Sequence, residues 1–211
     1  MQCNHHGLGG HYSVWRKRAQ FQVARRWASY CVRIIEDGLN RVTTSGSSSL
    51  EPDNGLQDAY GSDARECPCP IDQLTLVFSR RRAFDLVELE QLLEAVGWSR
   101  RPTRRVRRAL QHSLLTVGLW RHDPRVPRLV GFARCTGDGI LEATVWDVAI
   151  HPLYQRSGLG QHLMTYVLDT LCSLGTEHVT LFADPGVVSF YTRQGWILEP
   201  EGNRCAFWYA N

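Results

Sequence analysis

A chain of 211 residues, 43% of them hydrophobic, is long enough for one domain with a packed core and an extension. The formal net charge of +3 is too small to indicate nucleic-acid binding by itself, and no apolar run is long enough to predict a membrane span. The seven cysteines are scattered and odd in number, which favours a reducing compartment over a disulfide framework. We expect no metal site, because Cys67 and Cys69 lack a second ligand pair at a usable spacing.

The first 66 residues differ in composition from the rest of the chain. Residues 1–35 are rich in arginine and contain no acidic residue, and a tract rich in Thr and Ser follows at residues 43–49. This composition is typical of an organelle transit peptide with a linker, and the alternative is a disordered basic arm. We therefore expect an extension at residues 1–66 and a folded domain at residues 67–211.

The domain begins with a predicted strand and two predicted helices. Residues 74–78 (LTLVF) predict the strand. Asp85 is suited to cap an amphipathic helix that ends at Gly97, and Pro102 is suited to open a second helix. Six arginines decorate this second segment, which we interpret as a solvated face, with attraction of an acidic ligand as the alternative: Arg100, Arg101, Arg104, Arg105, Arg107 and Arg108.

The second half alternates strands with helices. Apolar runs bounded by turn residues predict strands at residues 114–120, 129–135, 141–150 and 179–183, and a closing pair at residues 196–198 and 205–209. A helical stripe follows Gly160, and Asp184-Pro185 begins a further helix that runs to Gly195. The order predicts an α/β (α+β) fold, with a mixed central sheet of about seven strands and helices on both faces.

The most informative stretch joins the strand that ends at Ile150 to the helix after it. Its loop, QRSGLG, contains two glycines, which let backbone N–H groups approach a phosphate closely. The positive end of the helix points to the same place, and Arg156 adds a fixed charge. The loop therefore predicts a pyrophosphate site. It lacks the Gly-Lys-Ser/Thr of a nucleotide-binding P-loop and the third glycine of the dinucleotide fingerprint.

The loop resembles the Q/R-x-x-G-x-G/A signature of the GNAT superfamily of acyl-CoA-dependent N-acetyltransferases. The stretches WDVAIHPLYQRSGLGQHLM, LFADPGVVSFYTRQGW and EGNRCAFWY are most similar to a plastid branch from plants and algae. That branch includes serotonin (arylalkylamine) N-acetyltransferases and enzymes that acetylate protein lysines and N-termini. The resemblance covers roughly residues 72–209.

The resemblance implies a GNAT fold with splayed central strands and acetyl-CoA as co-substrate. It implies acetyl transfer to an amine of a small molecule or a peptide, with neither a nucleic acid nor a membrane as partner. The implied location is a plastid, with a mitochondrion or the cytoplasm as alternatives. The chain would be a monomer or a homodimer.

The resemblance also implies roles for single residues. Backbone groups of Val148, Ala149 and Ile150 would hold the pantetheine arm and donate an N–H to the thioester oxygen. Tyr191 would protonate the departing thiolate. Asp184 lies seven residues earlier, on the same side of the expected helix, and is the candidate base, with a helix cap as the alternative. The loop residues that would hold the pyrophosphate are Arg156, Ser157, Gly158, Leu159, Gly160 and Gln161.

Thr144 occupies the position where the histone-acetyltransferase branch has a glutamate. A threonine does not accept a proton at neutral pH, so a water chain without a single base stays open. The same departure motivates an alternative function, a catalytically weak CoA-binding scaffold or regulatory protein. Several aromatic residues either line a pocket for an aromatic amine or fill the core: Trp146, Trp196, Phe207, Trp208 and Tyr209.

Overall fold

The computed structural model describes residues 54–68, 74–80, 83–123 and 125–202. Six strands in these ranges form one mixed sheet, in which neighbours in space are also neighbours in sequence. The first four pairings are antiparallel, and the last is parallel. The strands are β1 (Arg65–Glu66), β2 (Leu76–Ser79), β3 (Leu115–Arg121), β4 (Arg128–Gly137), β5 (Glu142–Ile150) and β6 (His178–Leu181).

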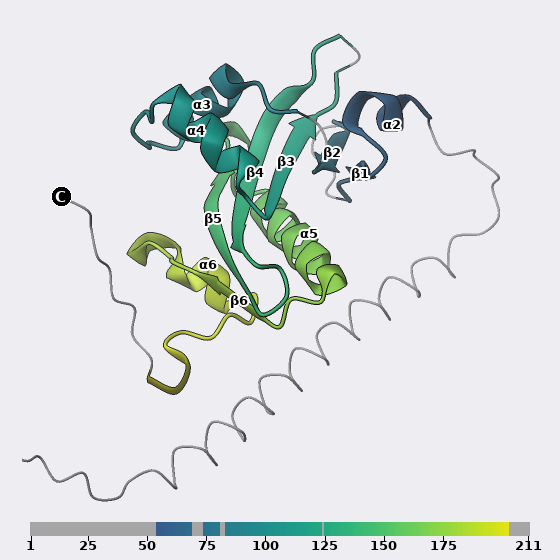
Figure 1. Ribbon diagram of the computed structural model, residues 1–211. Helices are drawn as coiled ribbons and strands as arrows, with labels where there is room; N and C mark the ends of the chain where they lie inside the picture. Colours follow the sequence, from purple (N-terminus) through teal and green to yellow (C-terminus); the bar gives the residue numbers. More distant parts are fainter. Residues whose placement is uncertain (1–53, 69–73, 81–82, 124, 203–211) are drawn as a thin grey trace, which may run out of the picture.

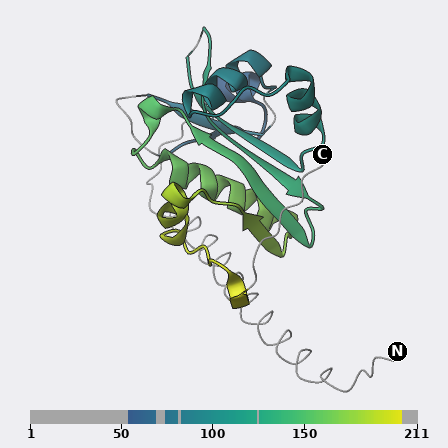
Figure 2. The same ribbon diagram turned by 90° about the vertical axis from the view of Figure 1, so that its left-hand side faces the viewer.

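Helices cover both faces of the sheet (Figures 1 and 2). Helices α3 (Leu86–Ala95) and α4 (Thr103–Gln111) lie on one face, and α5 (Leu159–Leu174) lies on the other. This arrangement confirms the predicted class. None of the helices in the described ranges is both long and apolar enough to cross a membrane. The shorter elements are α2 (Asn54–Tyr60), η1 (Pro152–Tyr154), η2 (Pro185–Val187), α6 (Val188–Thr192) and η3 (Pro200–Gly202).

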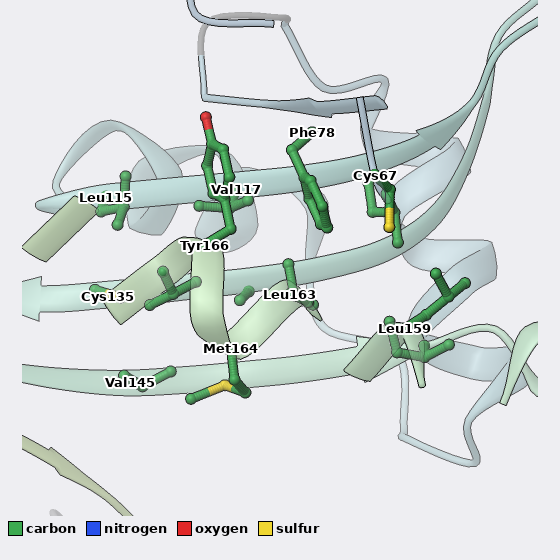
Figure 3. Packing of buried hydrophobic residues seen from close by; sticks show 14 of the residues in the cluster. Cys67, Phe78, Leu115, Val117, Cys135, Val145, Leu159, Leu163, Met164 and Tyr166 are labelled. Atoms are coloured by element: carbon green, nitrogen blue, oxygen red, sulfur yellow. The ribbon is translucent and has the colours of Figure 1, made fainter. Parts of the chain in front are cut away.

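Helix α5 fixes the geometry of the site, because it is packed tightly against the sheet. Figure 3 shows Leu159, Leu163 and Tyr166 of this helix directed at the strands. Leu163 is fully buried, and the ring of Tyr166 stacks on Phe78 with centroids 4.9 Å apart. A leucine buried in this way contributes about 2 kcal/mol. The N-terminus of α5 is therefore held at a fixed place next to the end of β5.

The predicted cap and stop of α3 are confirmed. The carboxylate of Asp85 accepts a hydrogen bond from Val87 N at 2.8 Å, which satisfies one of the free N–H groups at the helix start. Gly97 follows the helix with φ +88°, a left-handed conformation that glycine adopts without steric cost. The buried Leu89 and Leu92 then pack α3 on a second core cluster with Trp120.

The C-terminal part differs from expectation. Residues 196–198 form no strand, because Trp196 N donates to Tyr191 O at 3.3 Å and so closes the end of α6. The partner strand predicted at residues 205–209 lies outside the described residues, and the sheet as described has six strands instead of about seven. The continuous helix expected from Pro185 is divided into η2 and α6.

The expected boundary after residue 66 is also corrected, because residues 54–66 belong to the folded unit. Strand β1 pairs with β2, and Tyr60 at the end of α2 is fully buried. The Asp63 carboxylate accepts from Arg80 Nε at 3.1 Å. Sequence analysis missed this segment because its composition is mostly polar. The transit-peptide-like residues 1–53 lie outside the described residues.

Candidate active site

Strand β5 extends past its parallel neighbour β6. The ladder between them ends where Val145 is opposite Leu181, whereas β5 continues to Ile150. On its other side β5 remains paired with β4 as far as Ile150. The expected parting of the central strands is therefore present, and residues 146–150 have no β6 residue opposite them. An unpaired strand edge of this kind can bind an extended chain through main-chain hydrogen bonds.

A β-bulge lies within this unpaired part of β5. Arg134 is opposite Trp146 and Phe132 is opposite Ala149, so two β5 residues share the place opposite Ala133. The bulge reverses the alternation of side chains: Val145 packs in the core cluster under α5, but Ala149 packs in the cluster under α3. Sequence analysis did not identify this bulge, although the spacing of Val145, Val148 and Ile150 breaks the period of two.

The loop after β5 takes up two left-handed backbone conformations. Gly158 has φ +86° and Arg156 has φ +61°. For a residue with a Cβ this conformation costs about 1 kcal/mol, so the surrounding contacts must hold Arg156. The Gln155 amide provides one of these contacts by donating to Ile150 O at 2.8 Å, and Ser157 Oγ provides another by donating to Tyr154 O at 2.6 Å.

The loop ends at the N-terminus of the 16-residue helix α5. The first bonds at this end join the N–H groups of Gln161 and His162 to Gly158 O, at 3.0 and 3.2 Å. The N–H groups of Leu159 and Gly160 come before them and point out of the helix end. Together with the helix dipole and the exposed Arg156, they form a site suited to an anion.

Helix α6 packs against this anion site. A Cβ on Gly160 would lie 3.2 Å from Phe190 Cζ, closer than ordinary packing allows. Tyr191 follows Phe190 and is 7% exposed, whereas Phe190 is only partly buried. Tyr191 is therefore the more deeply buried of the two residues. Tyr191 is held by edge-on contacts with Phe190 and Trp196, at centroid distances of 4.9 and 6.0 Å.

Comparison with known proteins gives the family of this chain. The sequence model of the Acetyltransferase (GNAT) family matches residues 83–196, just over half of the chain. The chain belongs to the GNAT acetyltransferase family. It is therefore an acetyltransferase, and enzymes of this family use acetyl-CoA as co-substrate.

Relatives agree with this assignment. The chain is 62% identical over 175 residues to an uncharacterized ycf52-like N-acetyltransferase of Prochlorococcus marinus, covering 82% of this chain and 97% of the relative. It is 37% identical over 128 residues to the chloroplastic GCN5-related N-acetyltransferase 1 of Arabidopsis thaliana, covering 59% and 64%. A GNAT-family acetyltransferase structure from Streptococcus pneumoniae superposes with a TM-score of 0.54 at 26% identity, covering 64% and 98%.

The loop of this acetyltransferase fits the pyrophosphate of acetyl-CoA. Sequence analysis assigned it residues 156–161, and the structure brings all six together at one end of β5. Gly160 leaves room between the helix end and Phe190 that a Cβ would fill. The unpaired edge at Val148, Ala149 and Ile150 lies just before the short turn η1, which leads into the loop.

The environment of Tyr191 favours its neutral form. Burial raises the pKa of the phenol, and the negative charge of Asp184 raises it further. The phenol therefore carries its proton at neutral pH, which is the form that a general acid needs in order to protonate a departing thiolate.

Asp184 is exposed and lies directly before η2. It occupies the N-cap position of η2, as the cap alternative expects, but its side chain makes no capping hydrogen bond there. The seven-residue helical spacing used to place it beside Tyr191 does not hold either, since the helix is divided. The charge of Asp184 is nevertheless one of the two causes that raise the pKa of Tyr191, after burial.

Apart from Asp147, whose carboxylate binds Arg134 and Arg101, β5 places no carboxylate near the gap in place of the glutamate of the histone-acetyltransferase branch. Thr144 Oγ1 lies 2.9 Å from Thr180 Oγ1 and bridges β5 to β6. Glu142 begins β5 opposite His178, about 20 Å along the strand from Val148. His151 is a turn residue, with Nδ1 accepting a hydrogen bond from Leu153 N at 3.3 Å.

Two aromatic side chains flank the start of the strand gap. The rings of Trp146 and Phe182 lie 5.2 Å apart, and Phe182 is 45% exposed. The indole N–H of Trp146 donates to Thr136 Oγ1 at 2.8 Å, which fixes the ring. Trp196 packs against Tyr191 instead, and the remaining aromatic candidates, residues 207–209, lie outside the described residues.

Proposed function

We propose that this acetyltransferase transfers the acetyl group of acetyl-CoA directly to a primary amine in a plastid. One observation carries the proposal: β5 leaves β6 after Val145 and is followed, after the short turn η1, by an anion-binding loop at a helix N-terminus. A strand edge and a loop in this order suit an arm followed by a pyrophosphate. The acetyl group is supplied by the thioester of the bound co-substrate.

The chain's own groups have three tasks in this reaction. Residues 156–161 bind the pyrophosphate with backbone N–H groups and Arg156. The edge of Val148–Ile150 binds the arm and donates one N–H to the thioester oxygen, where negative charge develops. The short connection from β5 through η1 to α5 keeps the strand edge and the loop next to each other.

Two side chains move the protons. The amine must be neutral to attack, although a free alkyl amine has a pKa of about 10.4. Asp184 accepts the amine proton, directly or through water, as a bond forms from nitrogen to the acetyl carbon. The carbon–sulfur bond breaks, and Tyr191 Oη donates its proton to the sulfur that leaves.

The substrate we favour is an arylalkylamine such as serotonin. The rings of Trp146 and Phe182 support this choice, since they present an aromatic surface beside the gap where the amine must enter. A protein lysine or an N-terminal α-amine is the alternative, and it needs no aromatic contact.

The plastid location rests on two observations. The relative in Arabidopsis thaliana is named as chloroplastic, and residues 1–35 of this chain are rich in arginine and free of acidic residues. A fluorescent protein fused after residue 53 tests the location, with a mitochondrion or the cytoplasm as the contrary results.

The function is tested by incubating the full chain with acetyl-CoA and a panel of amines, and by measuring free thiol. The panel holds serotonin, tryptamine, a lysine peptide and a peptide with a free N-terminus. We expect thiol release above buffer with at least one amine and fastest with the arylalkylamines. Release with none of them contradicts the proposed reaction.

The threonine at position 144, where the histone-acetyltransferase branch has a glutamate, motivates one rival function, a CoA-binding scaffold with little catalysis. Calorimetry with CoA, combined with the amine panel, separates the two hypotheses. Binding without turnover on any amine supports the scaffold, and binding with turnover supports the enzyme.

A further inference from the structure

Asp147 lies where β5 parts from β6, inside the bulge. Its backbone has φ 54°, in the left-handed region that Asp tolerates better than most residues. Its carboxylate binds two arginines from two other elements. Arg134 Nε, on β4, donates to Oδ2 at 2.8 Å, and Arg101 Nη1, from the loop between α3 and α4, donates to Oδ1 at 3.0 Å.

These ion pairs are well placed to control the bulge. The side chains of Asp147 and Arg134 are only 11% and 15% exposed, so solvent screens their bond weakly. Arg134 is opposite Trp146 in the ladder, and its guanidinium reaches across the bulge to the next residue of β5. The Asp147–Arg134 ion pair therefore links the bulged strand β5 to its regular neighbour β4.

The bulge in turn decides where the following peptide groups point. The residues after it have exchanged faces relative to those before it, as the positions of Val145 and Ala149 in opposite core clusters demonstrate. Because successive N–H groups of a strand point to opposite edges, a rotation about the backbone of Asp147 would change which N–H of residues 148–150 faces the gap. The angle at this one residue thus sets the direction of the proposed thioester contacts.

We propose that Asp147 is a positioning residue for acetyl transfer, whose ion pairs with Arg134 and Arg101 hold the bulge and so fix which N–H of residues 148–150 faces the gap beside β6. The role rests on the proposed function. Asp147 is not a second base, because both of its oxygens accept hydrogen bonds from guanidinium groups.

Four variants separate the ion pairs from the backbone angle. Asp147→Gly removes the carboxylate but adopts a positive φ freely. Asp147→Asn keeps the shape and the tolerance of this conformation but removes the charge. Arg134→Met removes the buried partner, and Arg101→Gln removes the partner that is 52% exposed. The matched control is Arg100→Gln, whose arginine pairs with Glu94 away from the gap.

We expect kcat to fall about 10- to 100-fold in Asp147→Gly and Arg134→Met, because a small misplacement of a donor has an effect of this size. The kcat of Asp147→Asn should lie between the kcat values of these variants and that of the wild type. The Kd for CoA should stay within about threefold, since residues 156–161 supply most of the binding and are untouched. Combining Asp147→Gly with Arg134→Met should lower kcat little further.

Hydrogen exchange gives a readout that needs no co-substrate. In the ligand-free protein, the amides of residues 146–150 should exchange faster in Asp147→Gly than in the wild type or in Arg100→Gln. Exchange in α5 should remain unchanged.

A wild-type kcat in Asp147→Gly, or a loss of the same size in Arg100→Gln, overturns the positioning role. So does a rise in the Kd for CoA as large as the fall in kcat, since the residue would then serve binding. If Asp147→Gly fails to fold, Arg101→Gln takes its place. A fall in kcat in Arg101→Gln then supports the positioning role, and a wild-type kcat overturns it. A wild type without turnover on any amine overturns the proposed function, and this role falls with it.

Discussion

Tyr191 is both a buried core residue and the proposed general acid. The phenol is buried enough to keep its proton, yet α6 places it beside the loop that leads into α5. Replacement by phenylalanine keeps the ring contacts and removes the proton. We expect Tyr191→Phe to lower kcat by about 100-fold, within the usual range for a general acid, with little change in the Kd for CoA. An unchanged kcat would show that another group protonates the sulfur.

The pKa of Tyr191 offers an independent test of its surroundings. Burial raises this pKa first and the charge of Asp184 second, so Asp184→Asn should move the phenolate absorbance titration to lower pH. The part of the absorbance titration that is missing in Tyr191→Phe belongs to Tyr191. Because the folded pKa is raised, the phenol's contribution to stability is complete below about pH 10 and is lost as pH rises through the folded value. No shift in Asp184→Asn would show that the carboxylate is too far away to act.

Gly160 tests the anion site. The side chain of valine would clash with Phe190 and fill the space beside the helix end. Gly160→Val should therefore raise the Kd for CoA more than about tenfold, which is about 1.4 kcal/mol. Gly186→Ala is the control, because nothing lies within 4 Å of its Cβ position and its φ is not positive. Calorimetry that finds a wild-type Kd for the valine variant would refute the assignment of the loop.

At the scale of elements, β1 and α2 close one side of the sheet. Tyr60 contacts Trp120 and His122, with ring centroids 6.1 and 5.8 Å apart, so the segment before the expected boundary contributes to the core. Removing residues 1–66 should lower the unfolding free energy by about 3–5 kcal/mol, as for loss of a large buried aromatic residue. Removing residues 1–53 should change it little. Equal melting temperatures for the two truncations would contradict this account.

Helix α4 carries its arginines at an electrostatic cost. It has no acidic residue in its first turn, where the helix dipole favours one, and none of its residues is buried. Arg104→Glu should stabilise the protein by about 0.5 kcal/mol, through the dipole and through less repulsion from Arg107 and Arg108. Denaturant titration checks this. A destabilised variant would mean that Arg104 serves a contact beyond the solvated face we infer.

At the scale of the whole molecule, the site is a product of topology. A parallel pair needs a crossover, and α5 supplies it between β5 and β6. The crossover starts at the end of β5, so the loop, the helix N-terminus and the strand gap are necessarily adjacent. The helices on both faces then fix the sheet on which this arrangement depends (Figure 2).

The whole sequence contains a single lysine, Lys17. A mature chain that begins after Lys17 and no later than Asn54 would keep the folded unit and have no lysine to acetylate. Because arginine stays protonated in proteins, we expect any self-acetylation to appear at the new N-terminal amine. Mass spectrometry of the processed protein tests this, and acetyl groups within internal peptides would contradict it.

The sequence by itself determined the fold class, the loop at residues 156–161 and the stripe of α5. These features are encoded locally: Gly158 permits a backbone conformation that few residues adopt, and the helix reveals itself by its period. The cap at Asp85 and the stop at Gly97 are local for the same reason. Features of this kind can be predicted from a few neighbouring residues, without knowledge of any distant contact.

Only the tertiary structure decided the bulge, the burial of Tyr60 and the surroundings of Tyr191. Asp147 in the bulge binds Arg134 and Arg101, which are 13 and 46 residues away in the sequence. No local sequence pattern predicts contacts over such separations. Tyr60 is buried by residues about sixty positions later in the chain. Each of these features depends on which segments the folded sheet brings together, and a linear sequence does not state that directly.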